Sequence, residues 1–180
     1  MDHRASGHLP APQLSTPEIH RRPATPGDEP FLFDLYCAVR AHEFALMPLP
    51  EPLKQQLIRI QYTAQKDGYA AEYPGSGFEI VFNGEKKVGR IWIARHEDSF
   101  HLVDIALLPE AQNSGIGTGL IRELQREAAL AHKPVRLSVF RFNTGSVRFH
   151  ERLGFTVTNE DAIQFYYEWR PRSVDQDHVV

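Results

Sequence analysis

Two glycines separated by one residue, Gly115 and Gly117, lie between a strand-like segment and an amphipathic segment, an arrangement that can bind phosphate. The polar residues Gln112, Asn113 and Ser114 precede them. A glycine turn that opens a helix presents free backbone N–H groups at the positive end of the helix dipole, and these groups attract anions. Glycines before a helix also occur simply because they permit a tight turn. The spacing must therefore be compared with known phosphate-binding motifs.

Two common nucleotide-binding motifs do not fit this segment. A Walker loop requires Gly-x4-Gly-Lys-Ser/Thr, but counting from Gly115 places Leu120 at the second glycine, and no lysine follows it. A Rossmann fingerprint requires G-x-G-x-x-G, and its third glycine also falls on Leu120. The acidic partner expected about 20 residues later is missing, because the next strand-like segment reads VRLSVF. The sequence therefore does not predict an ATP or dinucleotide site.

The pattern Gln/Arg-x-x-Gly-x-Gly/Ala does fit residues 112–117, and here the sequence resembles the GCN5-related N-acetyltransferases (GNAT family). DIALLPEAQNSGIGTGLIREL (residues 104–124) resembles the family's strand–turn–helix. NTGSVRFHERLGF (residues 143–155) resembles its Asn-x-x-Ala-x-x-Leu-Tyr-Glu-Lys-Leu-Gly-Phe block. IHRRPATPGD resembles the usual opening of the family, so the resemblance extends over roughly residues 19–170.

The resemblance implies a fold and an activity. The fold is α+β (mixed α/β), with a central mixed, mostly antiparallel sheet flanked by about four helices. The activity is that of an acetyl-CoA-dependent N-acetyltransferase, which moves an acetyl group to a primary amine by direct attack in a ternary complex. Acetyl-CoA would be the cosubstrate, and the acceptor a small-molecule amine or a protein amino group. The alternative is a non-catalytic acyl-CoA-binding or sensing module.

The resemblance also implies which residues hold acetyl-CoA. The backbone of the glycine segment would bind the pyrophosphate, and the preceding strand would pair with the pantetheine arm like an added strand. One N–H group of that strand would also polarise the thioester carbonyl. Asn143 matches a family position that contacts the pantetheine, and asparagine is also a favoured helix N-cap. The implied cosubstrate-binding residues are Ile105, Ala106, Leu107, Gln112, Asn113, Ser114, Gly115, Ile116, Gly117, Thr118 and Asn143.

Two side chains are candidates for proton transfer. His150 occupies the position of the family's tyrosine, which protonates the departing thiolate. Imidazole, with a reference pKa near 6.5, can also donate a proton, although a lining role or protonation by water would serve equally. Asp104 is a candidate base because its neighbours in the strand alternation are apolar, and a carboxylate there must be paired or functional. A salt bridge to a nearby arginine is the alternative. Some relatives carry a glutamate base five residues before the asparagine, and that position is Ser138 here, which cannot act as a base unaided.

The elements that position these residues follow from the hydrophobic periodicity. Helices are predicted over residues 31–45, 53–68, 116–132 and 143–153, with Gly68 and Gly154 at two of their ends. Strands are predicted over residues 19–22, 78–82, 88–95, 100–108, 134–140 and 163–169, with a further short strand near 155–158.

Several polar residues are predicted to lie outside the catalytic chemistry. His96, Glu97 and His101 flank a predicted hairpin turn and are expected to be exposed, with too few ligands for a metal site. The resemblance places the acceptor in a groove built partly by the first two helices. The polar or aromatic residues available there are Glu43, Glu51, Gln55, Arg59, Tyr62 and Tyr73.

Composition restricts the partners and the compartment. The net charge is −3, without a basic stripe, so neither a nucleic acid nor an anionic membrane is expected as a partner. No apolar run approaches the length of a membrane span, and the N-terminus has no apolar signal region. The single cysteine, Cys37, indicates a reducing cytoplasm. We expect a disordered leader at 1–17, one acetyltransferase domain at 18–171 and a flexible tail at 172–180, as a monomer or homodimer.

Overall fold

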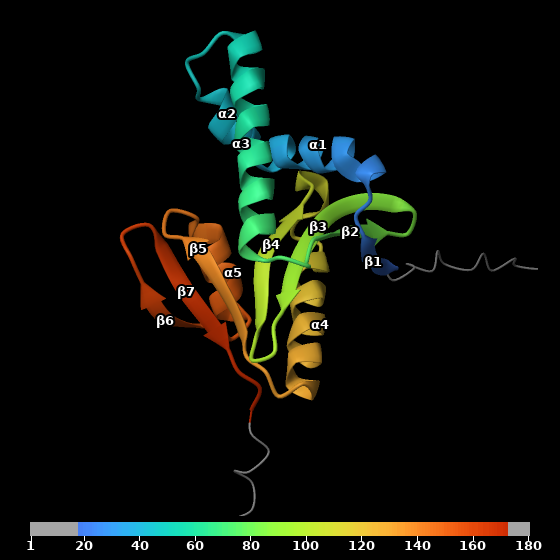
Figure 1. The fold of residues 1–180 in the computed structure, drawn as a ribbon, viewed down its shortest axis with the longest axis vertical. Coiled ribbons are helices and arrows are strands. Elements are labelled where there is room, and N and C mark those ends of the chain that lie inside the picture. Colours follow the sequence, from blue (N-terminus) through green and yellow to red (C-terminus); the bar gives the residue numbers. More distant parts are fainter. Residues whose placement is uncertain (1–17, 173–180) are drawn as a thin grey trace, which may run out of the picture.

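A seven-stranded sheet forms the centre of the computed structural model, which describes residues 18–172 (Figure 1). The strand order is β1-β2-β3-β4-β5-β7-β6. The strands are β1 (Ile19–Pro23), β2 (Phe78–Asn83), β3 (Lys86–Arg95), β4 (Phe100–Leu107), β5 (Val135–Phe140), β6 (Thr156–Glu160) and β7 (Gln164–Trp169). The helices are α1 (Glu29–Val39), α2 (Ala41–Ala45), α3 (Glu51–Glu72), α4 (Ile116–Leu130) and α5 (Thr144–Arg152), with short 3₁₀ turns at Pro26–Asp28 and Pro109–Ala111.

The sheet is mixed and mostly antiparallel, as predicted. All neighbouring strands are antiparallel except β4 and β5, which are parallel. The short additional strand predicted after residue 154 is present as β6. The predicted leader, residues 1–17, and the predicted tail beyond Arg172 lie outside the described residues.

Helices cover the two faces of the sheet with separate hydrophobic cores. Helices α4 and α5 pack on one face, where Ile91 and Leu124 belong to the same buried cluster. Helices α1, α2 and α3 pack on the other face, where Trp92 and Tyr62 share a second cluster. Ile91 and Trp92 are consecutive residues of β3 and face opposite layers because side chains alternate along a strand. We call these two sides the α4 face and the α3 face; Figure 1 views the α3 face.

Two predicted helix boundaries are wrong. The helix predicted over residues 31–45 is divided at Arg40, whose backbone (φ −111°, ψ 10°) is not helical, so the described residues form five α-helices rather than about four. Helix α3 does not end at Gly68 and continues to Glu72. The ring of Tyr69 packs edge-on against Trp92 at 5.7 Å, and this contact holds the last turn of α3 on the sheet.

Gly68 is therefore an interior helix residue, and its replacement gives a testable prediction. The residue is exposed, and a Cβ at this position would meet no atom within 4 Å. We expect Gly68→Ala to raise the free energy of unfolding by about 0.5–1 kcal/mol, because alanine loses less backbone entropy in a helix. Urea denaturation measures the change. A lower stability would mean that the last turn of α3 requires glycine.

Candidate active site

The parallel strands β4 and β5 separate soon after they begin. They pair only through Phe100 with Val135 and His101 with Arg136. Beyond His101 the two strands diverge (Figure 1). The opposite edge of β4 is paired with β3 along its length. The edge that faces β5 over residues 102–107 therefore carries backbone groups without a strand partner among the described residues, which is a template for an added extended chain. We call the space between the diverging strands the β4–β5 slot.

A β-bulge in β4 lies beside this slot. Trp92 of β3 pairs with Asp104, whereas the next residue of β3, Ile93, pairs with Leu102, so Val103 is an extra residue. Bulges redirect the side chains that follow them and occur often near active sites. Here the bulge moves Asp104 to the α3 face, whereas regular alternation would put it on the side of Leu102. The strand pattern alone could not predict this change of face.

Gly89 allows β3 to approach the end of β4 closely. A Cβ at Gly89 would overlap the carbonyl oxygen of Ala106 and lie 2.5 Å from Leu107 Cδ2. Only glycine fits such a contact without a shift of the neighbouring strand. The position of the strand end that leads into the glycine loop therefore depends on this residue.

The glycine loop presents free backbone N–H groups at the start of α4. Asn113 and Gly115 have positive φ angles of 57° and 87°, and Gly115 is the N-cap of α4. The first helical bond of α4 runs from the Gly119 N–H to the Gly115 carbonyl, at 2.9 Å. The N–H groups of residues 116–118 thus have no acceptor within the helix, and they lie at its positive end. This is the backbone arrangement that the sequence predicted, and its binding of a pyrophosphate remains a prediction.

The loop lies where three elements meet at the mouth of the β4–β5 slot. A Cβ at Gly117 would lie 3.5 Å from Phe149 Cζ of α5 and 3.7 Å from Leu107 Cδ1 of β4. The Gln112 side chain donates a hydrogen bond to the Leu107 carbonyl at 3.0 Å. The Ser114 hydroxyl donates to the Ala111 carbonyl at 2.6 Å. These two side chains fix the shape of the loop. Gln112 and Ser114 would therefore contact a ligand through their backbone groups.

Of two cavities formed by the described residues, the smaller one touches this loop. It has a volume of about 330 Å³ and is lined in part by Ser114, Gly115 and Gly119. The larger cavity, about 690 Å³, lies against Phe78 and Trp92 and contains no residue of β4, β5, α4 or α5. The larger cavity is thus separate from the β4–β5 slot.

Asn143 serves as the N-cap of α5. Its Oδ1 accepts a hydrogen bond from the Ser146 N–H at 3.1 Å, which is the capping role that the sequence suggested as one alternative. The cap fixes the start of the helix that carries Phe149 beside the glycine loop. The second suggested role, contact with the pantetheine, remains a prediction.

His150 is buried within α5, with 4% of its surface exposed. Its Nδ1 lies 2.9 Å from the Ser146 carbonyl oxygen, and its ring stands edge-on to Phe149 and Phe155 at 5.0 and 5.6 Å. Nε2 is buried and has no hydrogen-bond partner among the described residues. Burial lowers the pKa of the imidazole, so His150 is neutral at pH 7 with its proton on Nδ1.

Asp104 forms an ion pair with Arg90 on the α3 face. Arg90 Nε donates to Asp104 Oδ2 at 2.7 Å, and Arg90 is 2% exposed. The same guanidinium donates to Gln65 Oε1 at 3.4 Å and lies 4.5 Å from the centre of the Phe78 ring. The carboxylate at this position is therefore paired, which is the alternative that the sequence left open. Its role as a base remains a prediction.

His101 is half-buried on the α3 face, so the expectation that it is exposed is wrong; His96 and Glu97 are exposed, as predicted. The ring of His101 lies 5.3 Å from the ring of Tyr73, which immediately follows α3. The sequence missed this contact because α3 was expected to end at Gly68, one turn too early. Burial is the main cause of a lowered pKa at His101.

The other residues suggested for the acceptor groove are mostly engaged elsewhere. Tyr62 is buried in the α3-face core, and Arg59 lies 4.1 Å from the ring centre of Phe33. Exposed pairs join Glu43 with Arg40 and Gln55 with Glu51. Among the residues suggested for the groove, Tyr73 packs its ring against His101 of β4.

The residues between positions 18 and 172 form neither a metal site nor a membrane-spanning helix. No group of three or more His, Cys, Asp or Glu side chains there could hold a metal ion. None of the helices in that range is long and apolar enough to cross a membrane.

Comparison with known proteins agrees with this geometry. Residues 39–155 match the model of the "Acetyltransferase (GNAT) family". A 5-NmdU N-acetyltransferase of Pseudomonas phage PaMx11 is 26% identical over 142 residues, which cover 67% of this chain and 95% of that protein.

Solved structures show the same fold. PaiA N-acetyltransferase from Thermoplasma acidophilum, solved in complex with coenzyme A, has a TM-score of 0.64 at 20% identity and covers 85% of this chain and 99% of its own. An acetyltransferase from Thermus thermophilus has a TM-score of 0.60 at 19% identity, covering 84% and 96%. The family match spans more than half of the chain. The chain therefore belongs to the acetyltransferase (GNAT) family and is an acetyl-CoA-dependent acetyltransferase.

Proposed function

We propose that this acetyltransferase moves the acetyl group from acetyl-CoA to a primary amine by direct attack, with both substrates bound at the β4–β5 slot. The observation that carries the proposal is the slot itself. It has a free strand edge on one side, the unpaired N–H groups of the glycine loop at its mouth, and a closed end at His101 and Arg136. The name of the phage relative describes N-acetylation, which supports an amine as the acceptor class.

The residues of the slot fit acetyl-CoA. The pyrophosphate would accept hydrogen bonds from the N–H groups of residues 113–118, because the positive end of α4 favours anions. The backbone of Ile105–Leu107 would pair with the amide groups of the pantetheine arm along the free edge of β4. Asn143 would lie across the slot at the start of α5. Gly115 also fits this role, because the space that a side chain would occupy at this position is open and available to the ligand.

The chemistry at the slot is acyl transfer. The amine nitrogen attacks the thioester carbonyl carbon, an N–C bond forms, and the C–S bond breaks with its electron pair on sulfur. An acceptor that arrives as an ammonium ion loses two protons, of which one returns to the thiolate and one is released to solvent. A backbone N–H of β4 that points into the slot would stabilise the oxyanion in between.

The acceptor would approach from the α3 face, because the glycine loop and α5 occupy the other side of the slot. Asp104, Tyr69 and Tyr73 lie on or above this face. Burial raises the pKa of Tyr69 and of Tyr73 to about 12, so both phenols are neutral hydrogen-bond donors at pH 7. The Asp104 carboxylate, predicted as a base, also serves as the counter-ion of Arg90.

A panel assay tests the proposed function. Purified protein is incubated with acetyl-CoA and a set of small primary amines, amino-terminal peptides and lysine peptides. Thiol release is followed, and mass spectrometry identifies the product. We expect thiol release with at least one amine and a product whose mass increases by one acetyl group. Binding of acetyl-CoA without product across the whole panel would instead favour a binding or sensing module.

His150 is the acid candidate that the sequence offers for the thiolate, and its substitution gives a second prediction. In the neutral ring the proton lies on Nδ1 against the Ser146 carbonyl, so the acid role requires a proton on Nε2 instead. His150→Phe should slow turnover by about 10²–10⁴-fold if the residue protonates the leaving group. Affinity for acetyl-CoA should stay similar, since phenylalanine fits among Phe149 and Phe155. Steady-state kinetics with matched binding measurements gives both values. A loss of turnover below about threefold would reject the acid role. His150, whose Nε2 is buried, would then be a packing residue.

A further inference from the structure

We propose that His101 is the general base that takes the proton from the acceptor amine. The inference rests on the proposed function and names a residue for a step whose base the sequence did not reveal. The position at which some relatives carry a glutamate base is Ser138, and Asp104 is already paired with Arg90 at 2.7 Å. The remaining candidate must lie on the acceptor face, reach the slot and have a free lone pair.

His101 lies at the end of the slot where the strands close. It is the last residue of β4 that pairs with β5, and the bulge at Val103 follows two residues later. A pantetheine arm anchored at the glycine loop would run along β4 from Leu107 toward this closed end and could not pass it. Leu107 lies four residue steps along the strand from Val103, which is about 13 Å. The reactive end of the arm thus faces the stretch between the bulge and His101.

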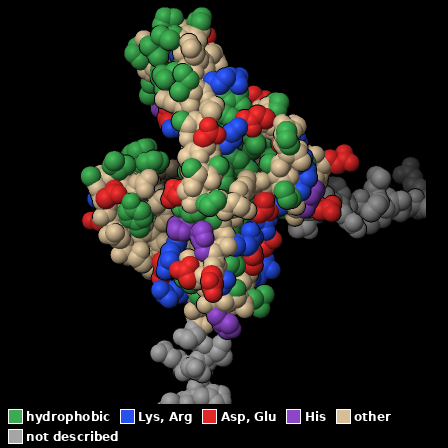
Figure 2. Space-filling model, in the orientation of Figure 1, with side chains coloured by type: hydrophobic (Ala, Val, Ile, Leu, Met, Phe, Trp, Pro, Cys, Tyr) green, Lys and Arg blue, Asp and Glu red, His purple; other side chains and the backbone are tan. Residues whose placement is uncertain are grey.

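The side chain of His101 lies on the face from which the acceptor approaches. Its neighbours in β4, Phe100 and Leu102, belong to the α4-face core, so alternation directs His101 to the α3 face. There its ring packs against Tyr73 at 5.3 Å and stands edge-on to His96 at 6.3 Å. Figure 2 shows histidine side chains gathered on this face just below the end of α3.

The two histidines beside the slot differ in what their nitrogens can do. His150 Nε2 is buried without a partner, and its Nδ1 is bonded to a helix carbonyl. The ring nitrogens of His101 make no hydrogen bond to another described residue and are not among the buried unpartnered atoms. A water molecule or an amine can therefore reach His101 directly, while Tyr73 fixes the plane of its ring.

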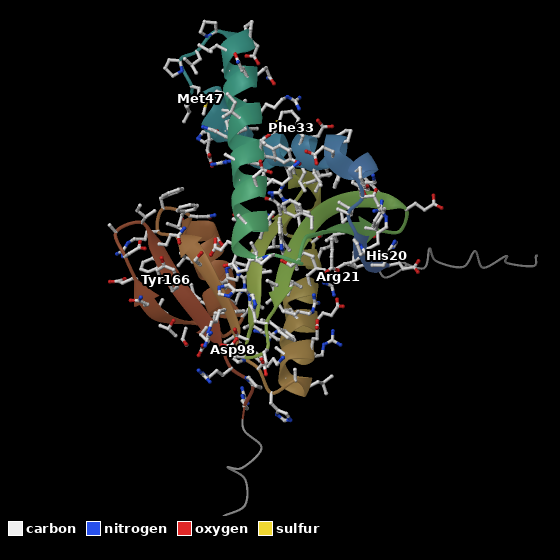
Figure 3. The ribbon with its side chains drawn as sticks, in the orientation of Figure 1. His20, Arg21, Phe33, Met47, Asp98 and Tyr166 are labelled. Carbon is white, nitrogen blue, oxygen red and sulfur yellow. The ribbon has the colours of Figure 1, made fainter. Side chains whose placement is uncertain are left out.

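The surroundings of His101 lower its pKa, which favours the neutral ring that can accept a proton. Burial beneath Tyr73 is the largest influence and lowers its pKa, and the nearby His96 and Arg136 act in the same direction. Glu72 at the end of α3 and Asp98 in the β3–β4 turn act in the opposite direction. Figure 3 labels Asp98 at this turn. Below its lowered pKa His101 is protonated and cannot act as a base, so kcat/KM should fall toward low pH.

The step balances without a further reactant. The ammonium form of the acceptor gives a proton to a ring nitrogen of His101, and the neutral amine then forms the N–C bond. The second proton of the nitrogen is lost as the C–S bond breaks, and one proton is taken up by the thiolate. His101 returns its proton to solvent through its accessible nitrogen.

His101→Gln tests the proposal, with His96→Gln as the matched control on the exposed neighbour. We expect His101→Gln to lose about 10²-fold or more in kcat/KM for an amine found in the panel. Its affinity for acetyl-CoA should not change, and the fall of kcat/KM at low pH that reports the His101 pKa should disappear. Added imidazole should restore part of the rate. His96→Gln should keep the rate and the fall at low pH, which should move only slightly upward because His96 no longer lowers the pKa of His101.

Two results would overturn the proposal. One is activity within about threefold of the wild type in both His101→Gln and His101→Asn. The other is a loss of rate that keeps the wild-type pH profile and is not rescued by imidazole, which would indicate a structural role.

If the wild type acetylates no amine, the proposed function fails and His101 is tested separately by NMR of its imidazole. Its resonances should then differ between the CoA and acetyl-CoA complexes. Identical resonances in the two complexes would place His101 away from the thioester and reject the inference.

Discussion

Replacing Gly117 with leucine is expected to abolish acetyl-CoA binding at micromolar concentrations while the protein stays folded. The Cβ of any residue at this position lies between Phe149 and Leu107, at 3.5 and 3.7 Å from their nearest carbons. A methyl group fits there at ordinary contact distances, but the branched end of leucine must displace these side chains or enter the mouth of the slot. Either movement separates the N–H groups of α4 from the pyrophosphate.

The size of the effect follows from the hydrogen bonds that would be lost. Hydrogen bonds to charged groups contribute about 1.5–3 kcal/mol each, so losing two of them weakens binding by about 10²–10⁴-fold. Isothermal titration calorimetry with acetyl-CoA measures the change. Gly117→Ala is the matched control and should bind nearly as well as the wild type. Unchanged affinity in folded Gly117→Leu would show that acetyl-CoA does not bind at the glycine loop.

Asp104→Ala is expected to destabilise the protein by about 3–5 kcal/mol, because it leaves the buried Arg90 charge without its partner. Arg90 cannot relax easily to water. It is 2% exposed, and its Nη1 is already buried without a hydrogen-bond partner among the described residues. Its remaining contacts are the Gln65 side chain and the Phe78 ring. Chemical denaturation of the wild type and the variant measures the loss.

The double variant Arg90→Met with Asp104→Leu separates stability from catalysis. Replacing both partners of a buried ion pair with apolar side chains is often nearly neutral, so this variant should recover most of the stability. Its pH profile of kcat/KM then shows whether Asp104 is a base. We expect the fall at low pH to remain, since we assign that role to His101. If the folded double variant lost the fall of kcat/KM at low pH, Asp104 would be the base instead. A small loss of unfolding free energy in Asp104→Ala would mean that Arg90 is better hydrated than its burial indicates.

The sequence predicted the backbone shape of the glycine loop because glycine reports backbone geometry directly. The spacing of Gly115 and Gly117 before an amphipathic helix corresponds to a loop with a positive φ at Gly115 and unpaired N–H groups beyond it. The parallel pairing of β4 with β5, and its early end, could not be read from local patterns. That feature depends on which strands meet in space.

Two features of the α3 face beside the slot could not be predicted from the sequence, each for a physical reason. A one-residue bulge at Val103 reverses the face of Asp104, and alternation arguments fail across a bulge. Helix α3 continues past Gly68, because packing of Tyr69 against Trp92 outweighs the low helix propensity of one glycine. That extra turn brings Tyr73 over His101 and changes an apparently exposed hairpin residue into a half-buried one.

The most direct test of the account is a crystal structure of the protein with acetyl-CoA. We expect the pyrophosphate oxygens to accept hydrogen bonds from the N–H groups of the loop at Gly115–Thr118. The pantetheine should pair with the free backbone edge of β4 at Ile105–Leu107, and the thioester should emerge on the α3 face between Val103 and His101. Acetyl-CoA bound elsewhere, for example in the larger cavity beside Phe78, with the edge of β4 left uncontacted, would contradict it.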